Sequence, residues 1–295
     1  MKPFEFAAAR NSIEALALLA RAGPDARLLA GGTDLLVELK TASRPPALVI
    51  DLSRAADLRD IALTDEGIAI GAAVTHEEIL RSPLIRKWLP AVADASRSVG
   101  AVQTRALATL GGNLVSCVPS MDGGPVLLAL DALVTLAGPA GRRRIALEQF
   151  FLGPRRTALG PGELLLEIVV PRRNLGKPAD FQKFGLRKGQ ALALVNVAAS
   201  FRLGEDGACV EPRIALGAVA PTVMRAVQAE NALAGRPTSD EALREAGRAA
   251  AIEARPITDF RASTGYRRDL IAVLTRRALE NVRARATARG ADEGR

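Results

Sequence analysis

Two glycine pairs are the residues of this sequence best suited to bind a charged ligand. Gly31 and Gly32 lie in "LLAGGTDLL", between a strand-like apolar run and a helix-like one, and a second pair lies in "ATLGGN" at 108–113. Glycine lacks a Cβ and tolerates positive φ, so consecutive backbone amides can approach and face a ligand. A helix that begins at Thr33 would add its unpaired N-terminal amides. Together these features favour a pyrophosphate site, and a plain turn is the alternative for either pair alone.

Neither pair follows a common nucleotide-binding motif. Asp51 ends the next predicted strand, where a Rossmann fold places its ribose ligand, but the glycines lack the GxGxxG spacing. The chain contains neither GKS nor GKT, which excludes a P-loop. Asp122, in "PSMDGGP", precedes a predicted helix and is a further polar candidate beside the second pair.

Histidine and cysteine are too scarce for most other site chemistry. The chain has one histidine, His76, and two cysteines, Cys117 and Cys209. These residues cannot build an ordinary Cys/His zinc site or hold an iron–sulfur cluster alone. His76 lies in "VTHEE", where Thr75 and Glu78 predict a capping box, and we interpret it as a helix-start residue without catalytic duty. Any redox chemistry must therefore come from a bound organic cofactor.

Composition limits the class of protein. The 295 residues carry a net charge of +8, but the arginines are scattered as doublets and only 3% of residues are aromatic, which disfavours nucleic acid as a partner. A solvated basic surface, or one that docks onto an acidic partner subunit, is favoured instead. We expect no membrane span, because no apolar run reaches about 18 residues. The start resembles no secretory signal and two cysteines form no disulfide framework, so we predict a cytoplasmic protein.

The predicted elements place the glycine pairs in an α+β protein. Residues 1–55 alternate strands and helices, and a hairpin follows at 58–72. Two short helices precede the second glycine pair, and a helix and three strands follow it up to residue 171. A polar segment at 172–180 marks a domain boundary. Beyond it, three strands and then three helices indicate a separate α+β domain, with ranges 181–187, 192–203, 208–219, 223–234, 239–254 and 261–287.

Four motifs in this order and spacing resemble a known family. They are "LLAGGTDLL", "QTRALATLGGNL", "SMDGGPVLLALDA" and "FQKFGLRKGQALALVNVAASF". They resemble the FAD-binding medium subunit of the molybdenum hydroxylases, the xanthine dehydrogenase and carbon monoxide dehydrogenase family, over roughly residues 3–285. The resemblance implies a two-subdomain FAD-binding fold of the vanillyl-alcohol oxidase and p-cresol methylhydroxylase type over 1–174, with subdomains of about 1–55 and 56–174. It also implies a C-terminal α+β domain over 178–287, with a three-stranded antiparallel sheet and helices.

The resemblance also implies which residues bind FAD, without a covalent link. The first loop would wrap the diphosphate through its backbone amides: Leu29, Ala30, Gly31, Gly32, Thr33, Asp34 and Leu35. The second motif would form the opposite wall with Thr109, Gly111, Gly112 and Asn113. Asp122 would contact the ribityl or a nearby polar part, and Leu165 and Lys183 would lie near the isoalloxazine ring. Structural alternatives are helix caps for Thr33, Asp34 and Asp122, a turn for Asn113, a sheet-edge charge for Lys183 and core packing for Leu165.

The sequence departs from the family pattern at three points. Neither loop contains a histidine, which disfavours histidyl attachment of FAD. The stretch "SCVPSMDGG" differs from the more usual Ala-Ser-Pro-rich version and puts the surroundings of Asp122 in doubt. Two cysteines are too few for the extra iron–sulfur cluster that some relatives carry.

The resulting prediction is an electron-transfer flavoprotein subunit with no catalytic residue and no metal site of its own. A large molybdenum-cofactor subunit and a small iron–sulfur subunit would be its partners, in a dimer of heterotrimers, and its FAD would pass electrons to an external acceptor. The alternatives are a stand-alone flavin oxidase of the same fold and, more remotely, a basic nucleic-acid-binding protein. The substrate, and the choice among NAD, quinone and oxygen as acceptor, stay open.

Overall fold

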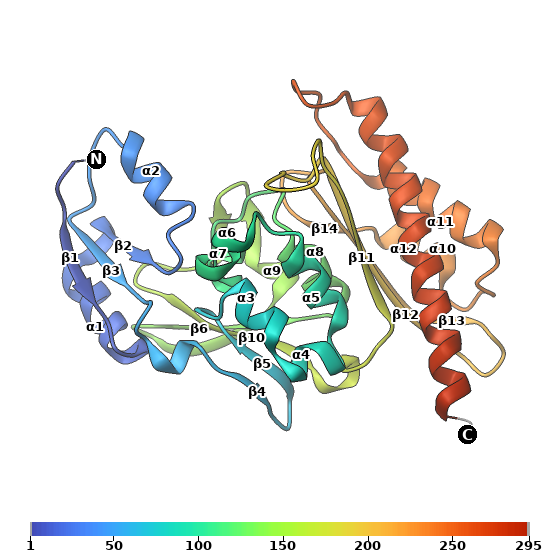
Figure 1. Ribbon diagram of the computed structural model, residues 1–295, viewed down its shortest axis with the longest axis horizontal. Helices are drawn as coiled ribbons and strands as arrows, with labels where there is room; N and C mark the ends of the chain where they lie inside the picture. Colours follow the sequence, from blue (N-terminus) through green and yellow to red (C-terminus); the bar gives the residue numbers. More distant parts are fainter. Residues whose placement is uncertain (1, 294–295) are drawn as a thin grey trace.

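Three main sheets follow one another along the molecule in the computed structural model, which describes residues 2–293 (Figure 1). The first sheet is parallel, with the order β1-β3-β2, and its strands are Glu5–Ala8, Leu48–Asp51 and Ala26–Leu29. Helix α1 (Ser12–Ala22) connects β1 to β2, and α2 (Leu35–Thr41) connects β2 to β3. The carboxyl end of β2 therefore leads directly into the first glycine pair.

The second sheet is antiparallel and forms the centre of the molecule. Its order is β4-β5-β10-β6-β7, with strands Ile61–Leu63, Gly67–Gly71, Leu164–Pro171, Leu133–Gly138 and Gly141–Ala146. The predicted hairpin is confirmed, because β4 and β5 pair antiparallel. A short helix α9 (Leu147–Phe150) and a two-stranded ribbon, β8 (Phe151–Gly153) with β9 (Arg156–Thr157), connect β7 to β10.

Six short helices connect the second sheet's strands β5 and β6. They are α3 (His76–Arg81), α4 (Pro83–Trp88), α5 (Pro90–Arg97), α6 (Val102–Leu107), α7 (Leu110–Val115) and α8 (Gly123–Ala129). The predicted capping box is present at α3, where the Thr75 hydroxyl accepts from the Glu78 amide and the Glu78 carboxylate accepts from the Thr75 amide. Helices α5 and α8 lie between the second and third sheets, and one hydrophobic core joins them to both.

The third sheet carries the C-terminal helices on its other face (Figure 1). Its antiparallel order is β11-β12-β13-β14, with strands Ala179–Phe184, Val195–Leu203, Cys209–Gly217 and Met224–Arg225. Helices α10 (Val227–Leu233), α11 (Asp240–Glu253) and α12 (Thr264–Glu293) cover it. The α+β class is confirmed, but the sheet has four strands where three were expected. The helix predicted from residue 223 begins at Val227, and Met224 and Arg225 pair with β13 instead.

None of the helices in the part of the chain that the structure describes is long and apolar enough to cross a membrane.

Candidate functional site

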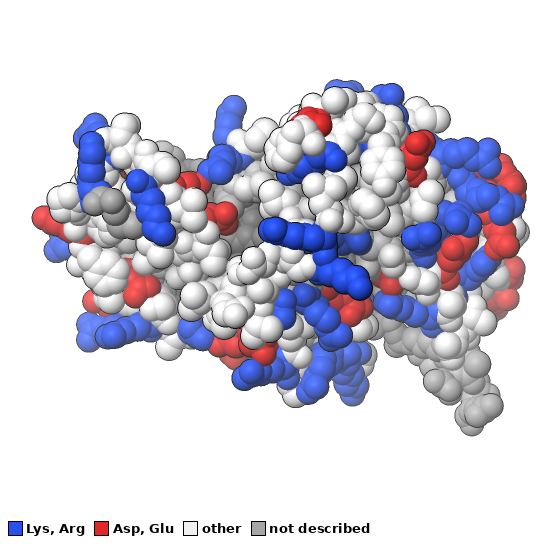
Figure 2. Space-filling model, turned by 45° about the horizontal axis from the view of Figure 1, so that its top comes forward, with Lys and Arg blue, Asp and Glu red and all other residues white. Residues whose placement is uncertain are grey.

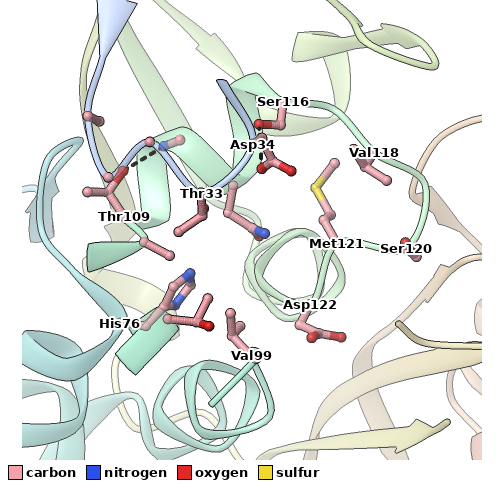
Figure 3. Close-up of a pocket in the computed structure, with 18 of the residues that line it drawn as sticks. Thr33, Asp34, His76, Val99, Thr109, Ser116, Val118, Ser120, Met121 and Asp122 are labelled. Carbon is pink, nitrogen blue, oxygen red and sulfur yellow. Dashed lines mark hydrogen bonds between the residues drawn. The ribbon is translucent and has the colours of Figure 1, made fainter. Parts of the chain in front are cut away.

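A cavity of about 570 Å³ lies where the first sheet, the helices between β5 and β6, and the third sheet meet. This volume lies within the range of about 300–1,000 Å³ that is typical of ligand and cofactor pockets. Its lining comes from the first glycine segment, from residues between α5 and α8, and from the loop between β11 and β12. Figure 3 shows Thr33 and Asp34 of the first segment facing the cavity together with Thr109, Met121 and Asp122 of the second sheet's helical layer.

The first glycine pair lies backbone to backbone against the chain that leads into the second motif. A Cβ on Gly31 would lie 2.0 Å from the Leu107 carbonyl oxygen, so only glycine allows this approach. Gly32 has φ of +70°, the left-handed conformation that glycine adopts at low cost. The two motifs are thus in direct contact, and glycine is required in the first for two separate reasons.

Five successive amides of the first segment have no hydrogen-bond acceptor in the part of the chain that the structure describes. They belong to Gly31, Gly32, Thr33, Asp34 and Leu35. All five residues line the cavity. Unpaired amides that follow one another in a turn form a binding site for an anionic group such as a phosphate.

The polar side chains of the first segment do not cap α2. The helix begins at Leu35, two residues later than predicted, and Asp34 stands at its N-cap position without a capping hydrogen bond. The Asp34 carboxylate instead accepts from the Ser116 hydroxyl at 3.2 Å, across the boundary between the two motifs (Figure 3). The capping alternative therefore does not apply to Asp34.

The second glycine pair lies in a helix, α7, where a loop was expected. The N-cap is Thr109, whose hydroxyl accepts from the Gly112 amide at 3.0 Å. The amides of Leu110, Gly111 and Asn113 donate to the carbonyls of Val74, Ala72 and Thr109. Because its first amides are already paired, this segment forms a wall of the cavity and not a second set of free donors.

The two glycines of α7 differ in their surroundings. A Cβ on Gly111 would lie 2.4 Å from the Ala72 carbonyl oxygen, so Gly111 allows α7 to pack on the chain after β5, and it does not line the cavity. Gly112 does line the cavity, and a Cβ there would meet the Thr109 hydroxyl at 2.8 Å. Gly111 therefore allows close helix packing, and Gly112 keeps the cavity surface of α7 free of a side chain.

Asn113 connects two helix starts at the cavity. Its side-chain oxygen accepts from the Gly123 amide at 3.1 Å, which fixes α8 against α7. Its side-chain nitrogen, Nδ2, has no hydrogen-bond partner among the residues that the structure describes, and the residue lines the cavity. Asn113 is thus held in place by its oxygen and can donate to a ligand through its nitrogen.

Asp122 joins the cavity wall to the third sheet. One carboxylate oxygen accepts from Lys183 Nζ in β11 at 2.5 Å, and the other accepts from the Asn196 side-chain amide in β12 at 2.9 Å. Lys183 Nζ also donates to the Ser98 carbonyl at 3.0 Å. Burial raises the pKa of Asp122, and the neighbouring ammonium opposes that shift. The carboxylate is engaged in this interdomain network and does not cap α8.

Four predicted site residues do not line the cavity: Leu29, Gly111, Leu165 and Lys183. Leu165 lies in β10, is 2% exposed and packs in the central core. Lys183 reaches the cavity wall only through Asp122. The proximity of Leu165 and Lys183 to an isoalloxazine ring stays a prediction. The lining includes the other predicted residues, namely Ala30, Gly31, Gly32, Thr33, Asp34, Leu35, Thr109, Gly112, Asn113 and Asp122.

The loop between β11 and β12 is part of the site although no residue of it was predicted there. It contributes Arg187, Gln190 and Leu192 to the lining. The Gln190 amide donates to the Gly100 carbonyl at 3.1 Å, which ties the loop to the chain after α5. Arg267 of α12 donates to the Leu194 carbonyl at the end of the loop. The glycines in "GLRKGQ" were the available signal: Gly185 lies near the end of the strand predicted at 181–187, and Gly189 lies before the strand predicted at 192–203.

His76 also lines the cavity. The sequence pattern indicates only a helix-start residue at this position and does not place it at the site. The side chain is fully buried, and its Nδ1 lies 3.1 Å from the Ser96 hydroxyl. Burial lowers the pKa of His76 to about 4, and the positive charge of Arg105 adds to that shift. The imidazole is therefore neutral at pH 7.

These donors fit FAD, the cofactor that the sequence resemblance implies. The free amides of residues 31–35 suit the anionic diphosphate, while Asn113 supplies an uncharged donor for the polar remainder of the molecule. Groups of three or more His, Cys, Asp or Glu side chains that could hold a metal ion do not occur among the described residues. The cavity offers backbone amides and the Asn113 side chain as donors, which suit an organic phosphate cofactor.

Comparison with known proteins covers almost the whole chain. Residues 2–173 match the family described as the FAD binding domain in molybdopterin dehydrogenase, and residues 180–282 match the CO dehydrogenase flavoprotein C-terminal domain. The chain is 33% identical to the 6-hydroxypseudooxynicotine dehydrogenase complex subunit alpha of Paenarthrobacter nicotinovorans, over 99% of this chain and 100% of that protein. It is also 33% identical to the carbon monoxide dehydrogenase medium chain of Hydrogenophaga pseudoflava, over 96% and 98% of the two chains.

A solved structure agrees with these sequence matches. The chain superposes with a TM-score of 0.91 and 34% identity on carbon monoxide dehydrogenase from Hydrogenophaga pseudoflava, in a form that lacks the Mo-pyranopterin moiety of the molybdenum cofactor. The match covers 97% of this chain and 99% of that one. The chain therefore belongs to the family of FAD-binding medium subunits of the molybdenum hydroxylases.

Proposed function

We propose that the cavity binds FAD without a covalent link, and that the chain is the electron-transfer flavoprotein subunit of a molybdenum hydroxylase complex. The row of unpaired amides from Gly31 to Leu35 carries this proposal, because it is a ready site for a diphosphate. When bound, FAD supplies two-electron redox chemistry. The protein's own part is to bind, orient and shield the cofactor.

Each wall of the cavity has a separate role in that binding. The first segment donates its amides to the diphosphate, and Gly112 leaves the surface of α7 free of a side chain. Asn113 donates to an uncharged part of the cofactor, held by its bond to Gly123. Asp122 and Lys183 keep the third sheet, and with it the β11–β12 loop, against the cavity.

The partners in this proposal are a large subunit with the molybdenum cofactor and a small subunit with iron–sulfur clusters. They would form a dimer of heterotrimers in the cytoplasm. Figure 2 shows Lys and Arg side chains in several groups over one face of the molecule, with acidic side chains among many of them. Such a surface supports docking to acidic subunits, and association through it weakens as salt is added.

A stand-alone oxidase of the same fold is the second candidate, and the arrangement of the site disfavours it. Such an enzyme needs an acid or base beside the flavin, and Tyr266, the sole tyrosine of the chain, is a residue of that kind. Tyr266 lies in α12, packs edge-on against Phe184 and does not line the cavity. His76 does line it, but burial lowers its pKa to about 4, so the imidazole is a weak base and is not an acid at pH 7.

The test is to purify the chain alone and together with the subunits encoded beside it. We expect the chain alone to show the visible bands of oxidised flavin, and the flavin to leave the protein on acid precipitation. Reduction of an artificial dye by substrate should require the partner subunits and molybdenum. A colourless chain that takes up no FAD would contradict the cofactor. Substrate-dependent dye reduction by the chain alone, free of molybdenum, would establish the stand-alone oxidase instead.

A further inference from the structure

His76 has one nitrogen in use and one without a partner. It is the first residue of α3, is fully buried, and borders the cavity, where Figure 3 places its ring between Thr109 and Val99. Nδ1 lies 3.1 Å from the hydroxyl oxygen of Ser96 in α5. Nε2 is buried and has no hydrogen-bond partner among the described residues. An unpaired buried polar atom is costly, and one at a cofactor cavity has a ligand as its natural partner.

The hydroxyl of Ser96 determines which nitrogen carries the proton. Ser96 is 2% exposed, and His76 Nδ1 is the only acceptor for its hydroxyl hydrogen among the residues that the structure describes. The hydroxyl therefore donates to Nδ1, and the proton of the neutral ring lies on Nε2. The two nitrogens point away from each other in the ring, so the bond to α5 directs Nε2–H away from that helix, and the residue itself borders the cavity.

The surroundings of the ring favour an uncharged acceptor. Val99, Thr104, Ala108 and Thr109 line the cavity in the same part of the site, and none of them is charged. Arg105 is the charged group whose field acts on the ring, and together with burial it keeps the imidazole neutral. The free amides of the first glycine segment already provide for the anionic part of the cofactor.

We propose that His76 is a positioning residue that donates a hydrogen bond from Nε2 to an uncharged acceptor atom of the riboflavin half of FAD. Ser96 sets the tautomer and the ring orientation, as an outer partner does for other functional histidines. The inference rests on the proposed function, because it needs FAD in the cavity. In this role the only histidine of the chain contacts FAD without forming a covalent bond to it.

The first test measures binding of FAD and of ADP to the full chain. His76→Leu removes the donor and should raise the dissociation constant of FAD about tenfold, which corresponds to about 1.4 kcal/mol. The affinity for ADP, which lacks the riboflavin half, should not change. His76→Gln keeps an N–H donor and should retain FAD affinity within about threefold of the wild type. Ser96→Ala leaves the imidazole in place but frees its tautomer, and should give an intermediate loss.

A second test needs no substitution. Because the chain has a single histidine, ring-labelled ¹⁵N-histidine gives the imidazole signals of His76 alone. FAD should shift the Nε2 resonance and protect its proton from exchange, whereas ADP should do neither. Unchanged imidazole signals on FAD binding, or equal FAD affinity of wild type and His76→Leu, would overturn the inference while leaving the proposed function intact. Equal weakening of FAD and ADP would overturn the assignment to the riboflavin half. A wild-type chain that binds no FAD would overturn the proposed function itself.

Discussion

Acid should destabilise this protein through His76 by an amount that follows from the structure. The pKa of the folded-state imidazole is about 4, against 6.5 for an exposed histidine. Because the folded-state pKa is lower, the unfolded state binds the proton at a higher pH than the folded state does. The stability that the neutral His76 contributes is therefore complete above pH 6.5 and is lost as the pH falls toward 4. Between about pH 7 and about pH 5 the linkage relation gives a loss of about 2 kcal/mol, and full protonation a loss of about 3 kcal/mol.

The assay is urea unfolding of the cofactor-free chain at the two pH values, followed by the fluorescence of Trp88. Trp88 is the only tryptophan, and it ends α4, directly after the helix of His76. The same experiment on His76→Gln corrects for carboxyl groups, including Asp122, whose raised pKa acts in the opposite direction. We expect the wild type to lose about 2 kcal/mol more than the variant. Equal losses in both proteins would show that His76 is not kept neutral by burial.

Further expectations concern the glycine segment and the interdomain ion pair. Gly31→Ala brings a Cβ within 2.0 Å of the Leu107 carbonyl oxygen and should abolish FAD retention, whereas Gly189→Ala, with open space around it, should leave flavin content unchanged. Retained flavin in the first variant would contradict the required backbone approach. Lys183→Met leaves the buried Asp122 carboxylate without its cation and should cost about 3–5 kcal/mol in urea unfolding. Adding Asp122→Asn should recover part of that loss, and simple additivity of the two substitutions would refute the coupling.

Local sequence signals were sufficient for many elements of the fold. The capping box of Thr75 and Glu78 begins α3, as the residue types predicted, and a similar local bond from the Glu14 amide to the Asn11 side chain begins α1. Such signals act over three or four residues and do not depend on the rest of the chain. The ordered motifs then identified the family.

The remaining features depend on contacts between distant residues. The second glycine pair is helical although glycine disfavours a helix, because the chain packs on the Ala72 carbonyl at a distance that only glycine permits. Asp122 pairs with a lysine 61 residues away, and Gln190 reaches the cavity through a bond to Gly100. A local sequence pattern does not predict contacts between residues so far apart in the chain. The part of the site that the third sheet and its loop form could therefore not be predicted from the spacing of motifs.

The late position of the β11–β12 loop in the chain has a consequence for biosynthesis. The amides of residues 31–35 leave the ribosome about 150 residues before Gln190, a delay of roughly 8–30 s at about 5–20 residues per second. Arg267, which holds the end of that loop through Leu194, is synthesised later still. A nascent chain therefore presents an incomplete cavity until Arg267, in the first turn of α12, has been synthesised, and we expect FAD to bind after that point. We expect chains interrupted before α12 to retain less flavin than complete chains, because their β11–β12 loop lacks the bond from Arg267.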